Sequence, residues 1–580
     1  MRLVGFAVCC LAAVLHGCSA PPASNNPSEM PSPYAGAYEA SPWAMAPPPP
    51  PGYWAGYAAY PAPPPANTGA GSFGQAPAFV FPPEPPQQAA PSATAAAAPA
   101  PVVILEAAPA PTEANTNTKT LDTRPRMGAI GQLAYIYKRP AKKGLALGYI
   151  RMGTSVPLLS DKPVKGDGCK RGWYAVAPRG YACLDTSKTT LNLSDPYYRA
   201  LESVAPKEGV WPYRYAFSNG APMYSRVPTP EEQERHERKF GRRGSYVQLA
   251  EWSAGHEELL TRDPIAATDP IPAFFAGGKR HVGGGPRDPR QLVWRVIPNG
   301  SMVAYAKAFE AQGRVWLLTP DLMLVPADRV RAIRQSEFQG VELGKGIELP
   351  LAWNRSHSAK PRYRRVEGGS LIKISGALPG KGYVPVTGEG ILHDGEQYLA
   401  VRGEPDIYVA ADDVTIAKAR KEMPRGLEPN RKWIDVKIVP GTLTAYEGLR
   451  PVFSTLFSPG KGGVPVEGKD HTKYATTATG YFPIEWKDRV ATMSNEKSEP
   501  KVLWFSDVPN IQYLRPPLAM HVAYWHEDFG KPKSAECVNV SPKDGKWLFA
   551  WTEPALPEGW GGIRPGDGNG RSTPVLITAK

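Results

Sequence analysis

The chain has 580 residues and a net charge of +13, and 42% of its residues are hydrophobic. After residue 18 it contains no run of ~18 continuous apolar residues, the length that a transmembrane helix needs, so we expect no membrane-spanning helix there. No nucleic-acid-binding motif accompanies the positive charge, and we therefore predict no nucleic-acid partner.

The N-terminus indicates export from the cytoplasm. Arg2 precedes an apolar run over residues 3–15, which has the length of the hydrophobic part of a signal peptide. The sequence LHGC at residues 15–18 resembles a bacterial lipobox, in which the cysteine is lipidated. We therefore predict that residues 1–18 are a lipoprotein signal peptide and that a lipid on Cys18 holds the protein in the outer membrane, facing the periplasm. The alternative is an ordinary cleaved signal peptide and a soluble periplasmic protein.

Residues 19–126 are predicted to form a disordered tether. They hold 26 of the 66 prolines, and Ala, Gly and Ser fill most of the rest. Such a segment cannot bury enough apolar surface to offset the entropy lost on ordering. Residues 1–126 carry four basic against six acidic side chains, a net of −2, which leaves +15 for the remainder. That charge suits an anionic envelope polymer or a lipid surface, and the alternative is a general contribution to solubility.

The remainder of the chain is expected to be mainly β and multidomain, because its short apolar alternations are broken by Gly and Pro. A weak repeat supports this, since each copy looks like a hairpin of aromatic and aliphatic strands closed by a polar turn. The copies lie at residues 173–183, 315–325 and 398–409. They divide the chain into three predicted β-rich units at residues 127–200, 205–335 and 345–420.

The first unit resembles a bacterial SH3-like domain between residues 135 and 183, and the other two are candidates for the same fold. This family often binds cell-wall peptides, and the alternative is that the units are spacers. Cys169 and Cys183 lie fourteen residues apart in the first unit. In an exported protein the two can form a disulfide.

Cys537 is the cysteine left without a partner in this part of the chain, sixteen residues after His521. A helix start is predicted just beyond it, with Ser541 as N-cap, Pro542 in the first helical position and Asp544 in the first turn. A thiol near a helix N-terminus and an imidazole has a lowered pKa and becomes a nucleophile. The alternative for Cys537 is a buried apolar filler.

The C-terminal motifs occur in an informative order. Strands predicted at residues 432–439, 443–448 and 452–457 are followed by TATGYFPI at 477–484, then His521, then SAECVN at 534–539. This order is similar to that of the L,D-transpeptidase catalytic domain (YkuD type), and the resemblance extends over residues 430–580. It implies a β-sandwich with short helices, placed after the small SH3-like barrels.

The resemblance also implies roles for individual residues. Cys537 matches the family nucleophile and His521 matches its base, while Ser534 and Asn539 match positions that shape the site. Trp525 is expected either to line a substrate groove or to be a packed loop aromatic. His526 is an alternative base, and the competing interpretation is a solvent-facing loop histidine.

The family reaction is acyl transfer on peptidoglycan stem peptides. The thiolate attacks a carbonyl of the stem's diamino acid, the terminal D-alanine leaves, and an amine on a second stem or on an envelope protein resolves the thioester. This chemistry needs no cofactor. The sequence contains neither a Walker-type loop nor His, Asp and Cys residues at zinc-ligand spacing, so we predict no cofactor and no metal.

Two departures from the family pattern matter. The usual Ser-His-Gly-Cys is replaced here by a motif in which Ala535 and Glu536 precede the cysteine. Ala535 removes an imidazole, and the carboxylate of Glu536 should disfavour a neighbouring thiolate. Ala478 also replaces a usual proline. The alternative function is therefore a catalytically weakened or inactive peptidoglycan-binding lipoprotein.

Overall fold

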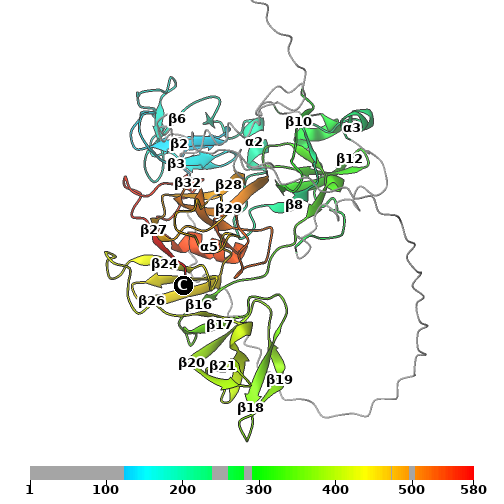
Figure 1. The fold of residues 1–580 in the computed structure, drawn as a ribbon. Helices are drawn as coiled ribbons and strands as arrows, with labels where there is room; N and C mark the ends of the chain where they lie inside the picture. Colours follow the sequence, from blue (N-terminus) through cyan, green and yellow to red (C-terminus); the bar gives the residue numbers. More distant parts are fainter. Residues whose placement is uncertain (1–122, 238–258, 280–281, 283–290, 472, 495–502) are drawn as a thin grey trace, which may run out of the picture. The chain divides into compact units, whose positions relative to one another are not determined.

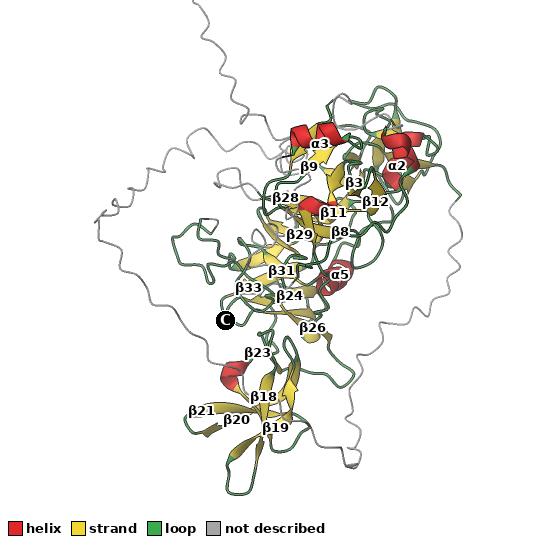
Figure 2. Ribbon diagram, turned by 90° about the vertical axis from the view of Figure 1, so that its right-hand side faces the viewer, coloured by secondary structure: helices red, strands yellow, loops and turns green. Residues whose placement is uncertain are grey.

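The computed structural model describes residues 123–237, 259–279, 282, 291–471, 473–494 and 503–580. The predicted signal peptide, Cys18 and the predicted tether up to residue 122 lie outside the described residues. Strands dominate the described structure and the helices are short (Figure 1 and Figure 2), which confirms the predicted mainly β fold class. Among the described helices, none combines the length and apolar character that crossing a membrane requires.

The first β-rich part extends over residues 126–202. Its elements are β1 (Arg126–Ala129), β2 (Leu133–Tyr137), β3 (Ala146–Arg151), β4 (Ser155–Pro157), β5 (Trp173–Ala175), β6 (Tyr181–Cys183), β7 (Thr189–Thr190) and α2 (Pro196–Glu202). One small sheet has the order β4-β1-β7, and β3, β2, β6 and β5 follow one another in a second sheet. Asp195 caps α2 by accepting hydrogen bonds from the first backbone N–H groups of the helix.

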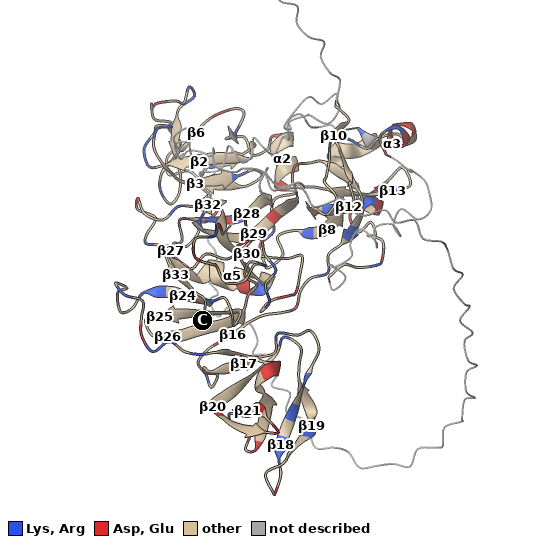
Figure 3. Cartoon of the chain, viewed as in Figure 1, with Lys and Arg blue, Asp and Glu red and all other residues tan. Residues whose placement is uncertain are grey.

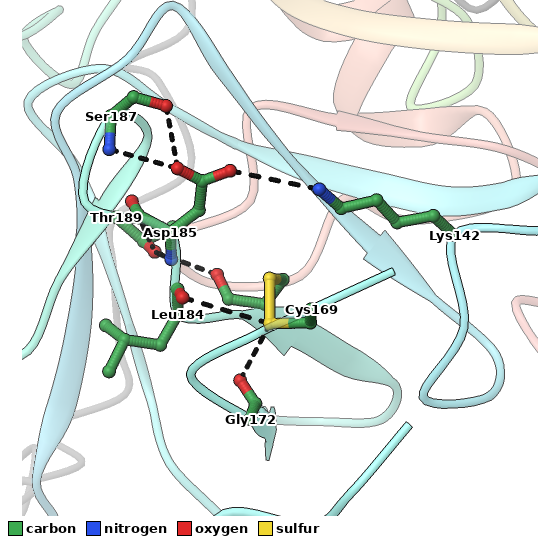
Figure 4. The surroundings of a disulfide bond; sticks show 8 residues. Lys142, Cys169, Gly172, Leu184, Asp185, Ser187 and Thr189 are labelled. Atoms are coloured by element: carbon green, nitrogen blue, oxygen red, sulfur yellow. Dashed lines mark hydrogen bonds and ion pairs between the residues drawn. A yellow bond between two sulfur atoms is a disulfide. The ribbon is translucent and has the colours of Figure 1, made fainter. Parts of the chain in front are cut away.

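The predicted disulfide between Cys169 and Cys183 is present in this part (Figure 4). It joins the loop before β5 to the last residue of β6. Next to it, Asp185 accepts hydrogen bonds from the backbone N–H and the hydroxyl of Ser187, and one of its carboxylate oxygens lies 3.8 Å from the Lys142 ammonium. The chain leaving β6 is therefore fixed by a covalent bond and by polar contacts.

The second part contains two sheets and short helical turns. Its elements are β8 (Arg214–Ser218), β9 (Pro222–Tyr224), α3 (Pro230–His236), η2 (Ala273–Gly278), β10 (Val293–Val296), β11 (Met302–Tyr305), β12 (Lys307–Ala311), β13 (Arg314–Leu318), β14 (Leu324–Pro326), η3 (Ala327–Arg329) and β15 (Val330–Ala332). Five of these strands form a sheet of order β10-β9-β14-β13-β12.

The third part is a sheet of seven strands. Its elements are β17 (Leu351–Trp353), β18 (Lys360–Arg365), β19 (Leu371–Leu378), β20 (Tyr383–His393), β21 (Glu396–Val401), β22 (Ile407–Ala410), η4 (Ala411–Asp413) and β23 (Thr415–Ala417). The strand order is β19-β18-β22-β21-β20-β17-β23. The blue segments of β18 and β19 in Figure 3 mark positions of Lys and Arg residues.

All three predicted aromatic hairpins are confirmed. They are the antiparallel pairs β5–β6, β13–β14 and β21–β22. In the second and third, a short 3-10 turn follows the hairpin directly, as η3 and η4. The repeat was visible in sequence because each hairpin buries aromatic and aliphatic side chains and turns on a polar segment.

The C-terminal domain is built from two sheets with one helix between them. The first has the order β16-β26-β25-β24-β33-β27. Its strands are β16 (Val341–Glu342), β24 (Lys432–Lys437), β25 (Thr442–Glu447), β26 (Arg450–Leu456), β27 (Gly480–Pro483) and β33 (Pro574–Thr578). The three strands predicted at the start of this domain are thus confirmed as β24, β25 and β26.

The second group contains β28 (Trp486–Ser494), β29 (Trp504–Arg515), β30 (Leu518–Val522), β31 (Val538–Val540) and β32 (Gly562–Ile563). The helix is α5 (Pro542–Trp551), and it begins as predicted: Ser541 is the N-cap and its hydroxyl accepts from the Asp544 N–H. Leu548 of α5 packs with strand residues such as Met520 and Val538 in the largest apolar core of the domain.

Two parts of the chain share a sheet with the C-terminal domain. β3 pairs with β32, and β11 pairs with β29, so strands from residues 126–202 and 214–332 continue a sheet through the β28–β29 hairpin. Buried polar contacts accompany this pairing. The Tyr149 hydroxyl donates to Asp488, and the Arg151 guanidinium pairs with Asp507. This continuity between distant segments was not predicted.

Candidate functional site

The strand pair β30–β31 places the motif residues together. The two strands run parallel, with Met520 opposite Val538 and His521 opposite Asn539. Because side chains alternate along a strand, Met520 and Val538 face the core beneath α5, while His521 and Asn539 point to the other face. Cys537 directly precedes β31 and, one residue before Val538, belongs to this second face.

Strand geometry then sets the spacing between the predicted nucleophile and base. His521 lies in β30, and Cys537 lies just before β31, two residues before Asn539, which is opposite His521. Continuing the strand geometry of about 4.8 Å between strands and about 3.3 Å per residue to this position gives a Cα separation of roughly 8 Å. The two residues that the sequence selected are therefore neighbours, and the thiol contacts the Pro517 carbonyl.

The thiol of Cys537 is almost enclosed, with 9% of the residue exposed. Its Sγ donates to the carbonyl of Pro517 at 3.7 Å, and no hydrogen bond joins it to a histidine among the described residues. The pKa of Cys537 is raised to about 12, mainly by burial; a hydrogen bond from the Ala519 backbone opposes this shift, and the Glu536 carboxylate adds a smaller upward contribution.

This environment differs from the expectation of a lowered thiol pKa. The predicted helix exists, but it begins at Pro542 and the three residues of β31 separate it from Cys537. The helix dipole acts mainly within the first turn, so its effect at the sulfur is small. Desolvation of the thiol dominates instead. In the resting structure Cys537 is therefore a neutral thiol.

His521 is buried as well, with 4% of the residue exposed. Its Nδ1 lies 2.9 Å from the Val522 carbonyl, and its Nε2 lies 3.1 Å from the side-chain amide nitrogen of Asn539. The Nδ1 must carry the proton, because a carbonyl can only accept. Burial lowers the pKa of His521 to about 4, so the ring is neutral near pH 7.

His526 is fully buried, and the interpretation of a solvent-facing loop histidine is wrong. Its Nδ1 accepts from the Asp528 backbone N–H at 3.2 Å, and its Nε2 lies 3.3 Å from the side-chain oxygen of Asn539. Burial lowers the pKa of His526 to about 3. Asn539 therefore connects the two histidines through the two ends of one amide.

Ser534 and Thr477 hold the backbone around the cysteine. The Ser534 hydroxyl donates to the Cys537 carbonyl at 2.6 Å, and the Thr477 hydroxyl donates to the Glu536 carbonyl at 2.8 Å. Thr477 also accepts from the Gly460 N–H at 2.8 Å. Ser534 and Thr477, the first residue of the 477–484 motif, thus each hold a backbone carbonyl at or next to Cys537, and the role of Ser534 in shaping the site stays a prediction.

Trp525 packs beside the base rather than standing free. Its ring lies 5.9 Å from that of His521 and 4.5 Å from that of Phe505, measured between ring centres. Part of the indole remains exposed. Trp525 therefore covers one side of His521, which is compatible with both sequence interpretations, a groove wall and a packed aromatic.

A pocket of about 430 Å³ lies beside the cysteine and was not predicted. It is lined by Gly468, Lys469, Asp470, His471, Ala478, Arg515, Pro517, Leu518 and Glu536. Two of the lining residues are neighbours of Cys537: Glu536 precedes it, and the Pro517 carbonyl accepts a hydrogen bond from its thiol. Both basic and acidic side chains face it. Charged loop residues far apart in sequence gave no signal that they would converge.

The described residues contain no group of three or more His, Cys, Asp or Glu side chains placed to hold a metal ion. The site instead has a thiol, two neutral imidazoles, an amide and a pocket of mixed charge. A thiol and an imidazole are groups that can supply a nucleophile and transfer a proton.

The fold and these residues define a β-sandwich domain with a cysteine and a histidine on one face of a parallel strand pair. Residues 431–577 match the family model of the L,D-transpeptidase catalytic domain (YkuD), so this part of the chain is similar to domains of that family. The match confirms the resemblance drawn from the motif order. No curated protein matches the chain.

Several solved structures are similar to the chain. An L,D-transpeptidase from Xylanimonas cellulosilytica is 23% identical, with a TM-score of 0.19, and the match covers 27% of this chain and 65% of that one. The catalytic domain of an E. faecium L,D-transpeptidase is 19% identical, with a TM-score of 0.19, over 26% of this chain and 98% of that one. An L,D-transpeptidase from Mycobacterium smegmatis is 16% identical, with a TM-score of 0.20, and the match covers 43% of this chain and 89% of that one.

Proposed function

We propose that this protein is a peptidoglycan L,D-transpeptidase that uses Cys537 as nucleophile and His521 as base. The observation that supports this most directly is the placement of Cys537, His521 and Asn539 on one face of β30–β31 within a domain of this family. A thiol and an imidazole at that spacing can exchange a proton and form a covalent acyl intermediate.

The proposed reaction proceeds in two halves. In the first, His521 Nε2 separates from the Asn539 amide N–H from which it accepts a hydrogen bond in the resting site. The Cys537 thiol turns from the Pro517 carbonyl and passes its proton to this Nε2, and the sulfur attacks a carbonyl of the stem's diamino acid. The imidazolium returns the proton to the departing amine of D-alanine, leaving a thioester. In the second half, an acceptor amine attacks the thioester, His521 takes its proton, and the sulfur leaves as thiolate and is reprotonated.

The resting protonation states fit a site that is activated by its substrate. Burial holds the pKa of the thiol high and that of His521 low, so the neutral pair is favoured before substrate arrives. Backbone N–H groups next to Cys537 are proposed to receive the negative charge that develops on the carbonyl oxygen.

The charged pocket is the proposed entry for the stem peptide. Lys469 and Arg515 suit its carboxylates, whereas Asp470 and Glu536 suit the amino group of a diamino acid. In this proposal Glu536 has a use that offsets its unfavourable effect on the thiolate. The acceptor is proposed to be an amine on a second stem or on an envelope protein.

The other parts are proposed to bring the enzyme to the cell wall. The hairpin units at 127–200, 205–335 and 345–420 are proposed to be SH3-like and to bind wall peptides, and a lipid on Cys18 is proposed to anchor the chain in the outer membrane, facing the periplasm. The confirmed hairpins and the disulfide support a folded, exported β-rich array.

A second candidate function is a non-catalytic peptidoglycan-binding lipoprotein. The high thiol pKa and the carboxylate of Glu536 beside it favour this alternative, because both oppose nucleophilic attack. The two candidates predict opposite results for covalent capture of the sulfur.

Ertapenem provides the test, because the catalytic domain of an E. faecium relative is described in an ertapenem-acylated form. The purified full chain and its Cys537→Ala variant are incubated with ertapenem and weighed by intact-mass spectrometry. We expect one adduct on the unaltered chain and none on Cys537→Ala. The matched control is His357→Gln, an exposed histidine outside the site, which should be acylated like the unaltered chain. No adduct on the unaltered chain would favour the binding protein.

A second measurement addresses the reaction itself. Tetrapeptide stems are supplied with an amine acceptor, and the release of D-alanine is followed together with the mass of the cross-linked product. D-alanine release that depends on Cys537 supports the transpeptidase. Binding of insoluble peptidoglycan without any D-alanine release supports the alternative.

A further inference from the structure

Four hydrogen bonds form one continuous chain beside Cys537. The Asp528 backbone N–H contacts Nδ1 of His526, Nε2 of His526 contacts the Asn539 side-chain oxygen, the Asn539 amide nitrogen contacts Nε2 of His521, and Nδ1 of His521 contacts the Val522 carbonyl. The distances are 3.2, 3.3, 3.1 and 2.9 Å in that order.

The two ends of this chain fix its direction. Asp528 contributes a backbone N–H, which can only donate, and Val522 contributes a carbonyl, which can only accept. With both rings neutral, one arrangement gives every contact a donor and an acceptor. His526 then carries its proton on Nε2, Asn539 donates toward His521, and His521 carries its proton on Nδ1.

We propose that His526 is a positioning residue that, through Asn539, holds His521 in its neutral Nδ1-protonated form and so sets the pH at which Cys537 becomes reactive. This role is not part of the sequence interpretation of His526 as an alternative base, since His526 acts here on another imidazole. The proposal deepens the proposed function and rests on it for its use in catalysis.

The mechanism of this control is a conflict between donors. Protonating His521 at Nε2 places an N–H against the Asn539 amide nitrogen, which is also a donor. Turning the amide by half a rotation relieves that contact but places its nitrogen against the N–H of His526. His526 cannot change its protonated nitrogen without meeting the Asp528 N–H. A buried donor without an acceptor raises the free energy of the folded protein, so the series of four hydrogen bonds opposes protonation of His521 at Nε2.

The groups around the two hydrogen-bonded histidines are consistent with a positioning role for His526. Burial, not a nearby charge, is the main cause of the lowered pKa of both histidines. On the far side of His526, the Asp528 carboxylate is held by Lys533 at 2.8 Å and by His357 at 3.4 Å.

Apolar and acidic groups complete the surroundings. The Phe529 ring lies 5.1 Å from that of His526, and the Trp525 ring covers His521. On the side of the sulfur, Glu536 is the charged neighbour that raises the thiol pKa. None of these groups replaces the amide of Asn539 as the contact of His521 Nε2.

The first test reads the protonated nitrogen directly. The full chain is prepared with nitrogen-15 histidine, and the ring signals of its nine histidines are followed from pH 5 to pH 8, with His521→Gln and His526→Gln identifying two of them. We expect His521 to stay protonated on Nδ1 alone and His526 on Nε2 alone. An Nε2-protonated His521, or a charged His521 ring at pH 6, would overturn the proposal.

The second test measures the consequence for the thiol. The rate at which iodoacetamide alkylates Cys537 is determined against pH from the mass of the peptide that contains it. His526→Gln offers an amide that can turn either way, so Asn539 can accept from a charged His521. We expect the midpoint of the profile to fall by about one pH unit, which is a tenfold rise in thiolate at a fixed lower pH.

The control for this test is His357→Gln, because His357 contacts the same Asp528 but is not one of the residues in the series of four hydrogen bonds. Its profile should match that of the unaltered protein. If His526 is only a packing residue, His526→Gln will change the rate at every pH and leave the midpoint in place, which contradicts the proposal.

A third variant keeps the question decidable if His526→Gln does not fold. Asn539→Asp supplies a carboxylate that accepts from both rings, and it should convert His521 to the charged form near neutral pH; a neutral His521 in Asn539→Asp would contradict the proposal. None of these readouts uses peptidoglycan or ertapenem. They can therefore succeed in a protein without transpeptidase activity, or fail in one that has it.

Discussion

The two faces of the β30–β31 pair have different contents and different roles. On one face Met520, Val538 and Val540 pack with α5 in an apolar core. On the other face Cys537 packs in a second apolar cluster, and the buried polar side chains of His521 and Asn539 follow it; the two histidines and the amide are joined by hydrogen bonds. Alternation along two short strands thus separates the residues of the main core from those for which we propose a role in catalysis.

The largest expected loss of stability comes from removing a side chain from the apolar core beneath α5. Leu548 of α5 is fully buried in the core shared with β30 and β31, so Leu548→Ala should lower the free energy of unfolding by about 3–5 kcal/mol through lost contacts and a cavity. The measurement is the urea dependence of pulsed Cys537 labelling, which reports unfolding of this domain within the full chain. Exposed Lys546, two residues away, is the control: Lys546→Ala should change the value by less than about 0.5 kcal/mol.

A substitution of Lys487 tests whether buried polar groups at the end of α5 also stabilise the domain. This fully buried lysine donates to the carbonyls of Phe549, Thr552 and Pro554 at 2.7 to 2.9 Å, at the end of α5. Lys487→Met keeps the length of the side chain but leaves these carbonyls without their donor, and we expect a loss of about 3 kcal/mol. The same pulsed labelling measures it.

Lys432, a lysine that donates to one carbonyl only, that of Trp551, provides the comparison for Lys487. Lys432→Met should cost less than half as much. An equal loss in both variants would show that the number of carbonyls held does not matter.

The polar face should make stability depend on acid. His521 has a pKa of about 4 when folded against an ordinary value of 6.5, so the unfolded chain binds its proton first as pH falls. The stability that His521 contributes is present above pH 6.5 and is lost as pH falls toward 4. Between pH 7 and pH 5 we expect a loss of roughly 2 kcal/mol from this group.

His521→Gln cannot be charged, so its unfolding free energy should change less between these two pH values than that of the unaltered chain. The exposed His357 provides the control, since His357→Gln should retain the full acid dependence. Identical pH dependence in all three proteins would contradict the desolvated state of His521.

The sequence predicted which residues occupy the candidate site, but not the hydrogen bonds that connect them. The order of His521, Ser534, Cys537 and Asn539 indicated the site because the family chemistry fixes these residue types. The start of α5 was predictable because Ser541 and Pro542 act locally. The thiol pKa was not, since it depends on burial and on which strand residues separate Cys537 from the helix.

His526 shows most clearly what could not be predicted from the sequence. A histidine in a polar loop segment is usually exposed, and periodicity gives no sign that its ring enters the domain. Its partner Asn539 lies thirteen residues away, and only the parallel pairing of β30 with β31 brings both against His521. In the same way, β3 and β11 join the sheet of the C-terminal domain through pairings that no local pattern specifies.

The smallest predicted effect concerns the departure that separates this site from its family. The Glu536 carboxylate raises the pKa of Cys537, although burial is the larger cause. Glu536→Gln keeps the side chain's size and removes its charge, so alkylation of Cys537 at pH 8 should become at most about tenfold faster. Glu527→Gln removes a carboxylate that pairs with Arg334 instead, and should leave the rate unchanged. A larger acceleration in Glu536→Gln would mean that the charge of Glu536, and not burial of the sulfur, keeps the thiol neutral.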